Sequence, residues 1–131
     1  MGLLLFSFKV RYLKFLHIAP TPRLGSLRDP TTKMSKSHPN LNSRILLTDT
    51  DTDIQKKIKS AVTDNIKSIC YDPENRPGVS NLLAILAACS TSNIENLNEL
   101  ARGFKDAYDL KVNVTDALIS TLGPIRSEYL K

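Results

Sequence analysis

The sequence predicts a mainly α-helical protein behind an irregular N-terminal part. Apolar residues recur at helical spacing in four segments after residue 50. Between residues 19 and 48, prolines and glycine interrupt the chain and no long periodic segment appears. The 131 residues, 41% hydrophobic and 24% charged, suit one soluble domain with a hydrophobic core.

The first 18 residues form an apolar leader that contains Lys9, Arg11 and Lys14 and no acidic residue. Its apolar run is too short to span a bilayer. Its charges follow that run, whereas a secretory signal places them before it. Two interpretations stay open: a mitochondrial presequence, or an unrelated, disordered leader that replaced a longer segment. The low serine content favours the second.

The lysine loop, which we define as Lys33-Met34-Ser35-Lys36-Ser37, follows an irregular approach over residues 19–32. Prolines stand on both sides of it and no apolar periodicity lies between them, so we expect neither helix nor strand. Its two lysines, two serine hydroxyls and free backbone N–H groups can wrap a polyphosphate. The alternative is a solvated basic loop without a ligand.

A short apolar run, Ile45-Leu46-Leu47, fits a short strand or an extended segment. A helix should begin just after it, because Thr50 can cap the helix and Asp53 can complete a capping box. The apolar face of this helix consists of Ile54, Ile58, Ala61 and Val62. Three lysines lie largely off that face and either form a solvated surface or contact RNA phosphates: Lys56, Lys57 and Lys59.

A polar connection follows over residues 63–78, with turn signals at Asp72-Pro73 and Arg76-Pro77-Gly78. Ile66 and Ile69 should attach it to the core. The helix that follows, over residues 79–89, is apolar on most sides and should therefore lie in the centre of the core.

Two further helices are expected. The capping box Ser92-Asn93-Ile94-Glu95 opens the first, and Gly103 stands where its C-terminal cap belongs. The apolar stripe of that helix contains Ile94, Leu97, Leu100 and Ala101. The last helix extends from Leu110 to Ile125, and Gly123-Pro124 should kink it or end its first half.

The cysteine count and the net charge narrow the range of partners. Cys70 and Cys89 are spaced closely neither to each other nor to a histidine, so we expect free buried thiols, a reducing compartment and no metal site. The formal net charge of +5 suits an anionic partner such as RNA or a nucleotide, although many proteins without such a partner are equally basic.

The lysine loop matches, letter for letter, the K-M-S-K-S signature of class I aminoacyl-tRNA synthetases. Three later segments resemble tryptophanyl-tRNA synthetases of the bacterial and mitochondrial type. These are residues 43–49, 57–64 and 71–83, which read S-R-I-L-L-T-D, K-I-K-S-A-V-T-D and Y-D-P-E-N-R-P-G-V-S-N-L-L. The resemblance is strong because the segments occur in order, and it does not extend to residues 1–18.

In that family the lysine loop closes over ATP and stabilises the pyrophosphate that leaves when tryptophan is activated. The resemblance therefore implies ATP with Mg²⁺, tryptophan and tRNA(Trp) as partners. It implies that Lys33 and Lys36 neutralise charge on the departing pyrophosphate. Ser35 and Ser37 would hold phosphate oxygens or the loop itself, and Met34 would pack near the adenosine. Weaker candidates for tRNA contact are Lys56, Lys57 and Lys59.

The resemblance also implies a domain organisation. The family places its tryptophan pocket and a His-x-Gly-His motif on a Rossmann-type fold before the lysine loop, whereas His17-Ile18-Ala19-Pro20 lacks the glycine and the second histidine. The 18 leader residues are too few for that parallel sheet. We expect the C-terminal helical domain of a class I synthetase with its K-M-S-K-S loop, lacking most of the Rossmann catalytic domain. Residues 1–18 would be an atypical leader, 19–48 a remnant of the catalytic domain and 49–131 the helical domain on the anticodon side of tRNA.

Two functions follow from this organisation. The chain is either a truncated tryptophan–tRNA ligase that is inactive alone, or a non-catalytic tRNA-binding or regulatory module. The family implies a homodimer for the full-length enzyme and no membrane partner. The predicted location is the mitochondrial matrix, with the cytoplasm as the alternative.

Overall fold

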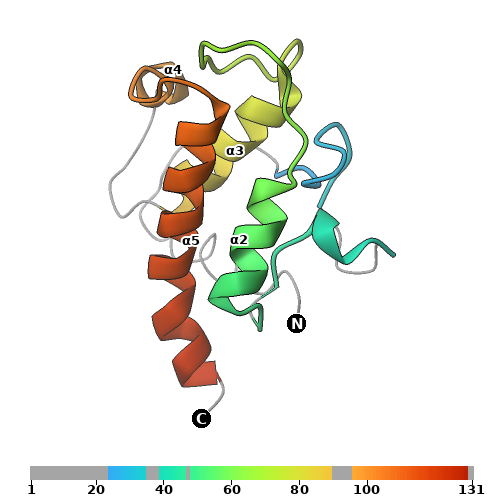
Figure 1. Cartoon of the computed structure of the whole chain (residues 1–131), viewed down its shortest axis with the longest axis vertical. Coiled ribbons are helices and arrows are strands. Elements are labelled where there is room, and N and C mark those ends of the chain that lie inside the picture. Colours follow the sequence, from blue (N-terminus) through green and yellow to red (C-terminus); the bar gives the residue numbers. More distant parts are fainter. Residues whose placement is uncertain (1–23, 35–38, 47, 90–95, 130–131) are drawn as a thin grey trace.

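The computed structural model describes residues 24–34, 39–46, 48–89 and 96–129 (Figure 1). Its elements in chain order are the 3-10 helix η1 (Leu41–Ser43) and the α-helices α2 (Asp51–Lys59), α3 (Pro77–Cys89), α4 (Leu97–Ala101) and α5 (Ala107–Tyr129). These ranges contain no strand, only an isolated antiparallel bridge between Gly25 and Lys33. The prediction of a mainly α-helical fold is confirmed for them, while the leader lies outside the described residues.

One hydrophobic core joins the helices. Helices α2 and α3 pack against α5, the long helix that follows the longest direction of the molecule, and α4 contacts α3 (Figure 1). Helix α3 is buried along most of its length, as its apolar sequence predicted. Fully buried side chains in this core include Ile54, Ile58, Val79, Leu82, Leu83, Ile85, Leu110, Val114, Leu118 and Leu122. Burial of one such side chain contributes about 1.5–3 kcal/mol, so this shared core holds the helices together.

The N-terminal end of α2 has the predicted capping box. The Asp53 N–H donates to Thr50 Oγ1 and the Thr50 N–H donates to the Asp53 carboxylate, both at 3.1 Å. The bond from the Thr50 N–H, together with the Thr50 hydroxyl, holds the pKa of the Asp53 carboxyl below its usual value. Of the two alternatives for Ile45 and Leu46, the short strand is not present, because the Leu46 N–H donates to the Asp49 carboxylate (2.9 Å) rather than to a neighbouring strand. Leu47 lies outside the described residues.

Side chains from two other segments satisfy carbonyls at the C-terminal end of α2. Lys111 Nζ on α5 donates to the carbonyl oxygens of Lys59 (3.0 Å) and Ala61 (2.8 Å). The Arg28 guanidinium donates to the Ser60 carbonyl oxygen. Burial lowers the pKa of Lys111, and the charge of Arg28 lowers it further. Cations at this end of the helix also interact favourably with its dipole. The C-terminal end of α2 is therefore bonded to both segments.

Arg76 organises the polar connection before α3. Its Nε and Nη2 donate to the two Asp64 carboxylate oxygens at 2.9 and 2.8 Å, and the guanidinium also donates to the carbonyls of Ser68 (2.5 Å) and Ile66 (3.2 Å). The side chain is 6% exposed. A fork that binds both oxygens of one carboxylate fixes orientation as well as distance. Arg76 therefore joins three positions of this connection, Asp64, Ile66 and Ser68.

The remaining predictions for the connection have mixed outcomes. Ile69 is buried as expected, whereas Ile66 is 53% exposed. The turn predicted at residues 76–78 is wrong, because Pro77 opens α3, where a missing N–H costs nothing. Gly78 is required there, since a Cβ atom would lie 2.3 Å from the Val62 carbonyl oxygen.

Acid should weaken the structure partly through Asp64. Hydrogen bonds from Arg76 hold the pKa of Asp64 below the usual 3.8, so its ion pair stabilises the fold above that value and is lost as the pH falls through the lower, folded-state pKa. We expect Asp64→Asn to lower the free energy of unfolding by about 1 kcal/mol at pH 6. Urea unfolding at pH 6 and pH 2.5 measures the effect, which should shrink at the lower pH. An equal loss at both pH values would contradict this account.

The last two helices differ from expectation at their ends. Asn96 caps α4 by accepting from the N–H groups of Asn98 (3.0 Å) and Glu99 (3.3 Å). The predicted capping box at residues 92–95 lies outside the described residues. The C-cap of α4 is Arg102, so Gly103 stands at the position after it, where a C-terminal glycine was expected. Helix α5 does not end at Pro124 but continues to Tyr129. Pro124 is exposed, so loss of its N–H leaves the buried face of α5 in place.

Both cysteines are free thiols, as predicted, but only Cys89 is buried. Cys70 is exposed because it lies on the surface connection that Arg76 organises. No helix in the described part of the chain combines the length and the apolar character needed to cross a membrane.

Candidate functional site

The lysine loop begins at the end of a short hairpin. Gly25 and Lys33 form an antiparallel bridge, flanked by hydrogen bonds from Ser26 N to Thr32 O (2.8 Å) and from Met34 N to Leu24 O (3.2 Å). The Lys33 side chain is exposed and belongs to no helix. Lys33 therefore stands at the surface on a backbone that is held in place. Ser35, Lys36 and Ser37 lie outside the described residues.

Short-range hydrogen bonds shape the turn of this hairpin. Ser26 Oγ accepts from the N–H groups of Arg28 (3.2 Å) and Asp29 (3.3 Å). Asp29 Oδ1 accepts from the N–H (3.2 Å) and the hydroxyl (2.6 Å) of Thr31. Such side-chain to backbone bonds are typical of tight turns. The Asp29-Pro30-Thr31-Thr32 stretch is therefore an ordered support for Lys33.

Met34 has a different role from the one expected. Its side chain is 3% exposed and belongs to the hydrophobic core with Leu27, Ile45 and Ile58. A side chain in that position is not available to the adenosine of a nucleotide. Met34 instead anchors the first half of the lysine loop in the core.

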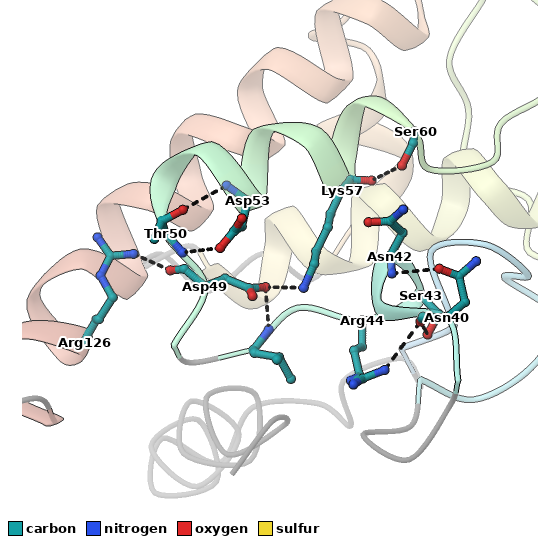
Figure 2. Close-up of polar contacts among 11 residues, drawn as sticks. Asn40, Asn42, Ser43, Arg44, Asp49, Thr50, Asp53, Lys57, Ser60 and Arg126 are labelled. Atoms are coloured by element: carbon teal, nitrogen blue, oxygen red, sulfur yellow. Dashed lines mark hydrogen bonds and ion pairs between the residues drawn. The ribbon is translucent and has the colours of Figure 1, made fainter.

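The chain returns to the hairpin after the lysine loop. Asn40 caps η1 by accepting from the Asn42 N–H (2.9 Å), and its carbonyl accepts from the Ser43 hydroxyl (2.7 Å) (Figure 2). The Ser43 carbonyl then accepts from the Leu27 N–H (2.9 Å). This bond joins the two ends of the segment between residues 27 and 43.

Asp49 joins the segment that follows the lysine loop to two helices. Its Oδ2 accepts from Lys57 Nζ on α2 (2.7 Å) and from the Leu46 N–H (2.9 Å). Its carbonyl accepts from Arg126 Nη1 on α5 (2.5 Å) (Figure 2). Arg126 Nη2 also pairs with Asp51 (3.0 Å). The side chains of Asp49 and Lys57 are 6% and 7% exposed, so this ion pair is a buried one.

The three lysines of α2 therefore do not form one surface. Lys56 and Lys59 are exposed, as predicted, but Lys57 is buried against Asp49. The helical pattern correctly placed the apolar face but did not reveal that a carboxylate lies beside it. Of these three lysines, Lys56 and Lys59 are accessible to a polyanion.

Two residues that contact the segments around the lysine loop were not among the predicted site residues. Asn81 on α3 accepts from the Gly25 N–H (2.7 Å) and donates to the Gly25 carbonyl (2.9 Å). Arg126 on α5, the second of these residues, donates to the Asp49 carbonyl oxygen (2.5 Å). A polar residue within the apolar run 79–89 was the available signal for Asn81, whereas nothing in the sequence indicated the partner of Arg126.

Comparison with known proteins identifies the family. Residues 10–123 match the model of tRNA synthetases class I (W and Y). The chain belongs to this family. It is 46% identical over 107 residues to a tryptophan–tRNA ligase from Oceanobacillus iheyensis, covering 82% of this chain and 32% of the relative. It is 42% identical over 115 residues to the mitochondrial tryptophan–tRNA ligase of Saccharomyces cerevisiae, covering 87% of this chain and 30% of the relative.

Solved structures give the same result for this synthetase chain. A crystal structure of tryptophanyl-tRNA synthetase from Mycoplasma pneumoniae superposes with a TM-score of 0.68 at 34% identity, covering 81% of this chain and 34% of that chain. Tyrosyl-tRNA synthetase from Aeropyrum pernix gives 0.56 at 28% identity, covering 80% and 33%. The resemblance inferred from the lysine loop and the later segments is confirmed. The chain spans about a third of the length of the curated relatives that it matches.

Proposed function

We propose that this chain is part of a tryptophan–tRNA ligase, which activates tryptophan with ATP and transfers it to tRNA(Trp). The observation that carries the proposal is the match to tryptophan–tRNA ligases at 46% identity over 107 residues. The family match includes the K-M-S-K-S sequence itself. The rest of the ligase would supply the Rossmann-type fold and the tryptophan pocket.

In the proposed reaction, a carboxylate oxygen of tryptophan attacks the α-phosphorus of ATP. The bond between the α- and β-phosphates breaks, and pyrophosphate leaves with its negative charge. Lys33 and Lys36 would neutralise that charge, while Ser35 and Ser37 would hold phosphate oxygens or the loop. The exposed Lys33 at the end of an anchored hairpin fits this role. Met34 would contribute core packing only.

The Mg²⁺ of this reaction would arrive bound to the ATP phosphates. Among the described residues, no three His, Cys, Asp or Glu side chains lie close enough together to hold a metal ion. Bound Mg²⁺ would neutralise part of the phosphate charge, and the lysine loop would contact the phosphate oxygens that remain.

The domain assignment is also part of this proposal. Residues 19–48 would be the end of the catalytic domain with the lysine loop, and residues 49–131 would be the C-terminal helical domain on the anticodon side. Support comes from the relatives, two thirds of whose length lies outside the match. We propose the family's homodimer for the complete enzyme. The yeast mitochondrial relative supports the mitochondrial matrix as the location, and the bacterial relatives support the cytoplasmic alternative.

Tryptophan-dependent exchange of pyrophosphate into ATP tests the activity. We expect no exchange from the chain alone, and measurable exchange from a chimera in which it replaces the matching third of the Oceanobacillus iheyensis ligase. The unmodified ligase is the positive control. A chimera that folds and binds tryptophan but never supports exchange would contradict the proposal.

A non-catalytic tRNA-binding module is the second candidate, and the exposed Lys56 and Lys59 on α2 favour it. Each phosphate contact that is lost should reduce the dependence of log K on log salt by about 1. We therefore expect the double substitution Lys56→Gln with Lys59→Gln to weaken tRNA(Trp) binding and reduce that slope by about 2. Filter binding between 50 and 200 mM KCl measures it, with Lys67→Gln on the exposed connection as the control. Equal slopes for both variants would exclude α2 as the tRNA contact.

A further inference from the structure

Asn81 is a buried polar residue within an apolar helix. Both polar atoms of its side-chain amide form hydrogen bonds with one residue that is distant in the sequence. Asn81 is 8% exposed, between Ser80 and the core residue Leu82 on α3. Its Oδ1 accepts from the Gly25 N–H at 2.7 Å, and its Nδ2 donates to the Gly25 carbonyl at 2.9 Å. The two residues are 56 positions apart in the sequence.

The position of Gly25 explains why an amide suits this contact. In the bridge with Lys33, the hydrogen bonds come from the flanking Ser26 and Met34 amides. The N–H and C=O of Gly25 therefore point away from Lys33, and without Asn81 they would be buried and unpaired. The Asn81 amide supplies one acceptor and one donor, as a third strand would.

Gly25 is also confined from its other side. A Cβ atom on this residue would lie 2.4 Å from the Pro30 carbonyl oxygen, so only glycine fits beside the turn. The hairpin that ends in Lys33 is therefore fastened to α3 through Asn81 and to the residues after the lysine loop through the Leu27 to Ser43 bond (2.9 Å). These contacts fix the position of the Lys33 backbone relative to the helical core.

We propose that Asn81 is a positioning residue for Lys33, the first residue of the lysine loop: by holding both backbone groups of Gly25, it fixes the place of Lys33 relative to the helices. The consequence for phosphate binding rests on the function proposed above. The claim that Asn81 holds the hairpin in place does not rest on that function, and hydrogen exchange in the isolated chain tests it separately. If Asn81 served only the stability of α3, the hairpin amides would respond to its loss no more than the rest of the core.

The main experiment compares amide exchange in Asn81→Leu and Ile85→Val. Both residues are buried on α3, and leucine has the same number and branching of side-chain heavy atoms as asparagine but cannot make its hydrogen bonds. Each rate is referenced to the global stability of its variant. We expect the Ser26 and Met34 amides to exchange about tenfold faster in Asn81→Leu than in the control, while the Leu118 amide on α5 is equally protected in both. Hairpin rates within about twofold of the control would overturn the proposal.

Asn81→Asp provides a second test that is valid even if the protein does not fold normally with leucine at position 81. A protonated carboxyl can both donate to the Gly25 carbonyl and accept from its N–H, whereas a carboxylate cannot donate. We expect protection of the Met34 amide, relative to intrinsic exchange, to be near wild type at pH 4 and reduced at pH 7. Wild type should show no such change. Reduced and equal protection at both pH values would count against the two-bond contact.

Titration with inorganic pyrophosphate separates this proposal from the proposed function. We expect Lys33→Met and Asn81→Leu each to weaken pyrophosphate binding about tenfold. Pyrophosphate affinity that is unaffected by Lys33→Met would contradict the phosphate-binding role of the loop. The exchange results would still decide whether Asn81 holds the hairpin.

Discussion

Replacing Lys57 with methionine should lower the free energy of unfolding by about 3 kcal/mol. The substitution keeps the length of the side chain but removes the ammonium group that lies 2.7 Å from Asp49 Oδ2. The Asp49 carboxylate would then be buried with the Leu46 N–H as its remaining donor in the contacts described above. Urea unfolding followed by circular dichroism measures the loss, and Lys56→Met, an exposed position on the same helix, should change the value by no more than about 0.5 kcal/mol.

A double-mutant cycle distinguishes the loss of an ion pair from a general defect in packing. Asp49→Asn removes the negative charge and keeps an oxygen that can accept from the Leu46 N–H. Combining it with Lys57→Met should therefore restore part of the stability, because no unpaired charge stays buried. A double variant that loses the sum of the two single losses would show that the charges do not interact, which contradicts the assigned pair.

The ion pair between Lys57 and Asp49 shows which features of this protein can be predicted from its sequence and which cannot. The capping box at Thr50 and the apolar positions Ile54 and Ile58 follow from local rules, and α2 begins where those rules place it. The same helical pattern placed Lys57 on the solvent side. Its burial depends on the position of Asp49, which follows the run Ile45-Leu46-Leu47 that was predicted as a short strand or an extended segment, and no periodicity encodes that position.

The candidate site shows the same division. The lysine loop was found because its five letters match a family signature, and its hairpin has the irregular geometry that the prolines indicated. The contacts that hold the segments before and after it join Gly25 to Asn81 and Asp49 to Arg126, across 56 and 77 positions. Such contacts exist only once α3 and α5 have packed. Met34 was misassigned for the same reason, since the core that receives it consists of residues from several helices.

The largest expected effect on activity comes from Lys36. In the chimera with the matching ligase, Lys36→Ala should lower the turnover number by about 10² to 10³, with little change in the KM for ATP. The reason is that negative charge on the bridging oxygen and on the departing pyrophosphate grows as the bond to the α-phosphorus breaks. An ammonium group that meets this charge stabilises the transition state more than it stabilises bound ATP.

Steady-state kinetics of pyrophosphate exchange at varied ATP concentration separates the effect on turnover from the effect on the KM for ATP. The control is Lys67→Ala, which removes one lysine from the exposed connection. Lys33→Ala should show a similar split between turnover and KM, because both ammonium groups would act on the same leaving group. If Lys36→Ala instead raised the KM for ATP and left turnover unchanged, the lysine would bind ground state and transition state equally. The loop would then serve nucleotide capture, and the charge of the departing pyrophosphate would have to be met by groups on the other two thirds of the enzyme.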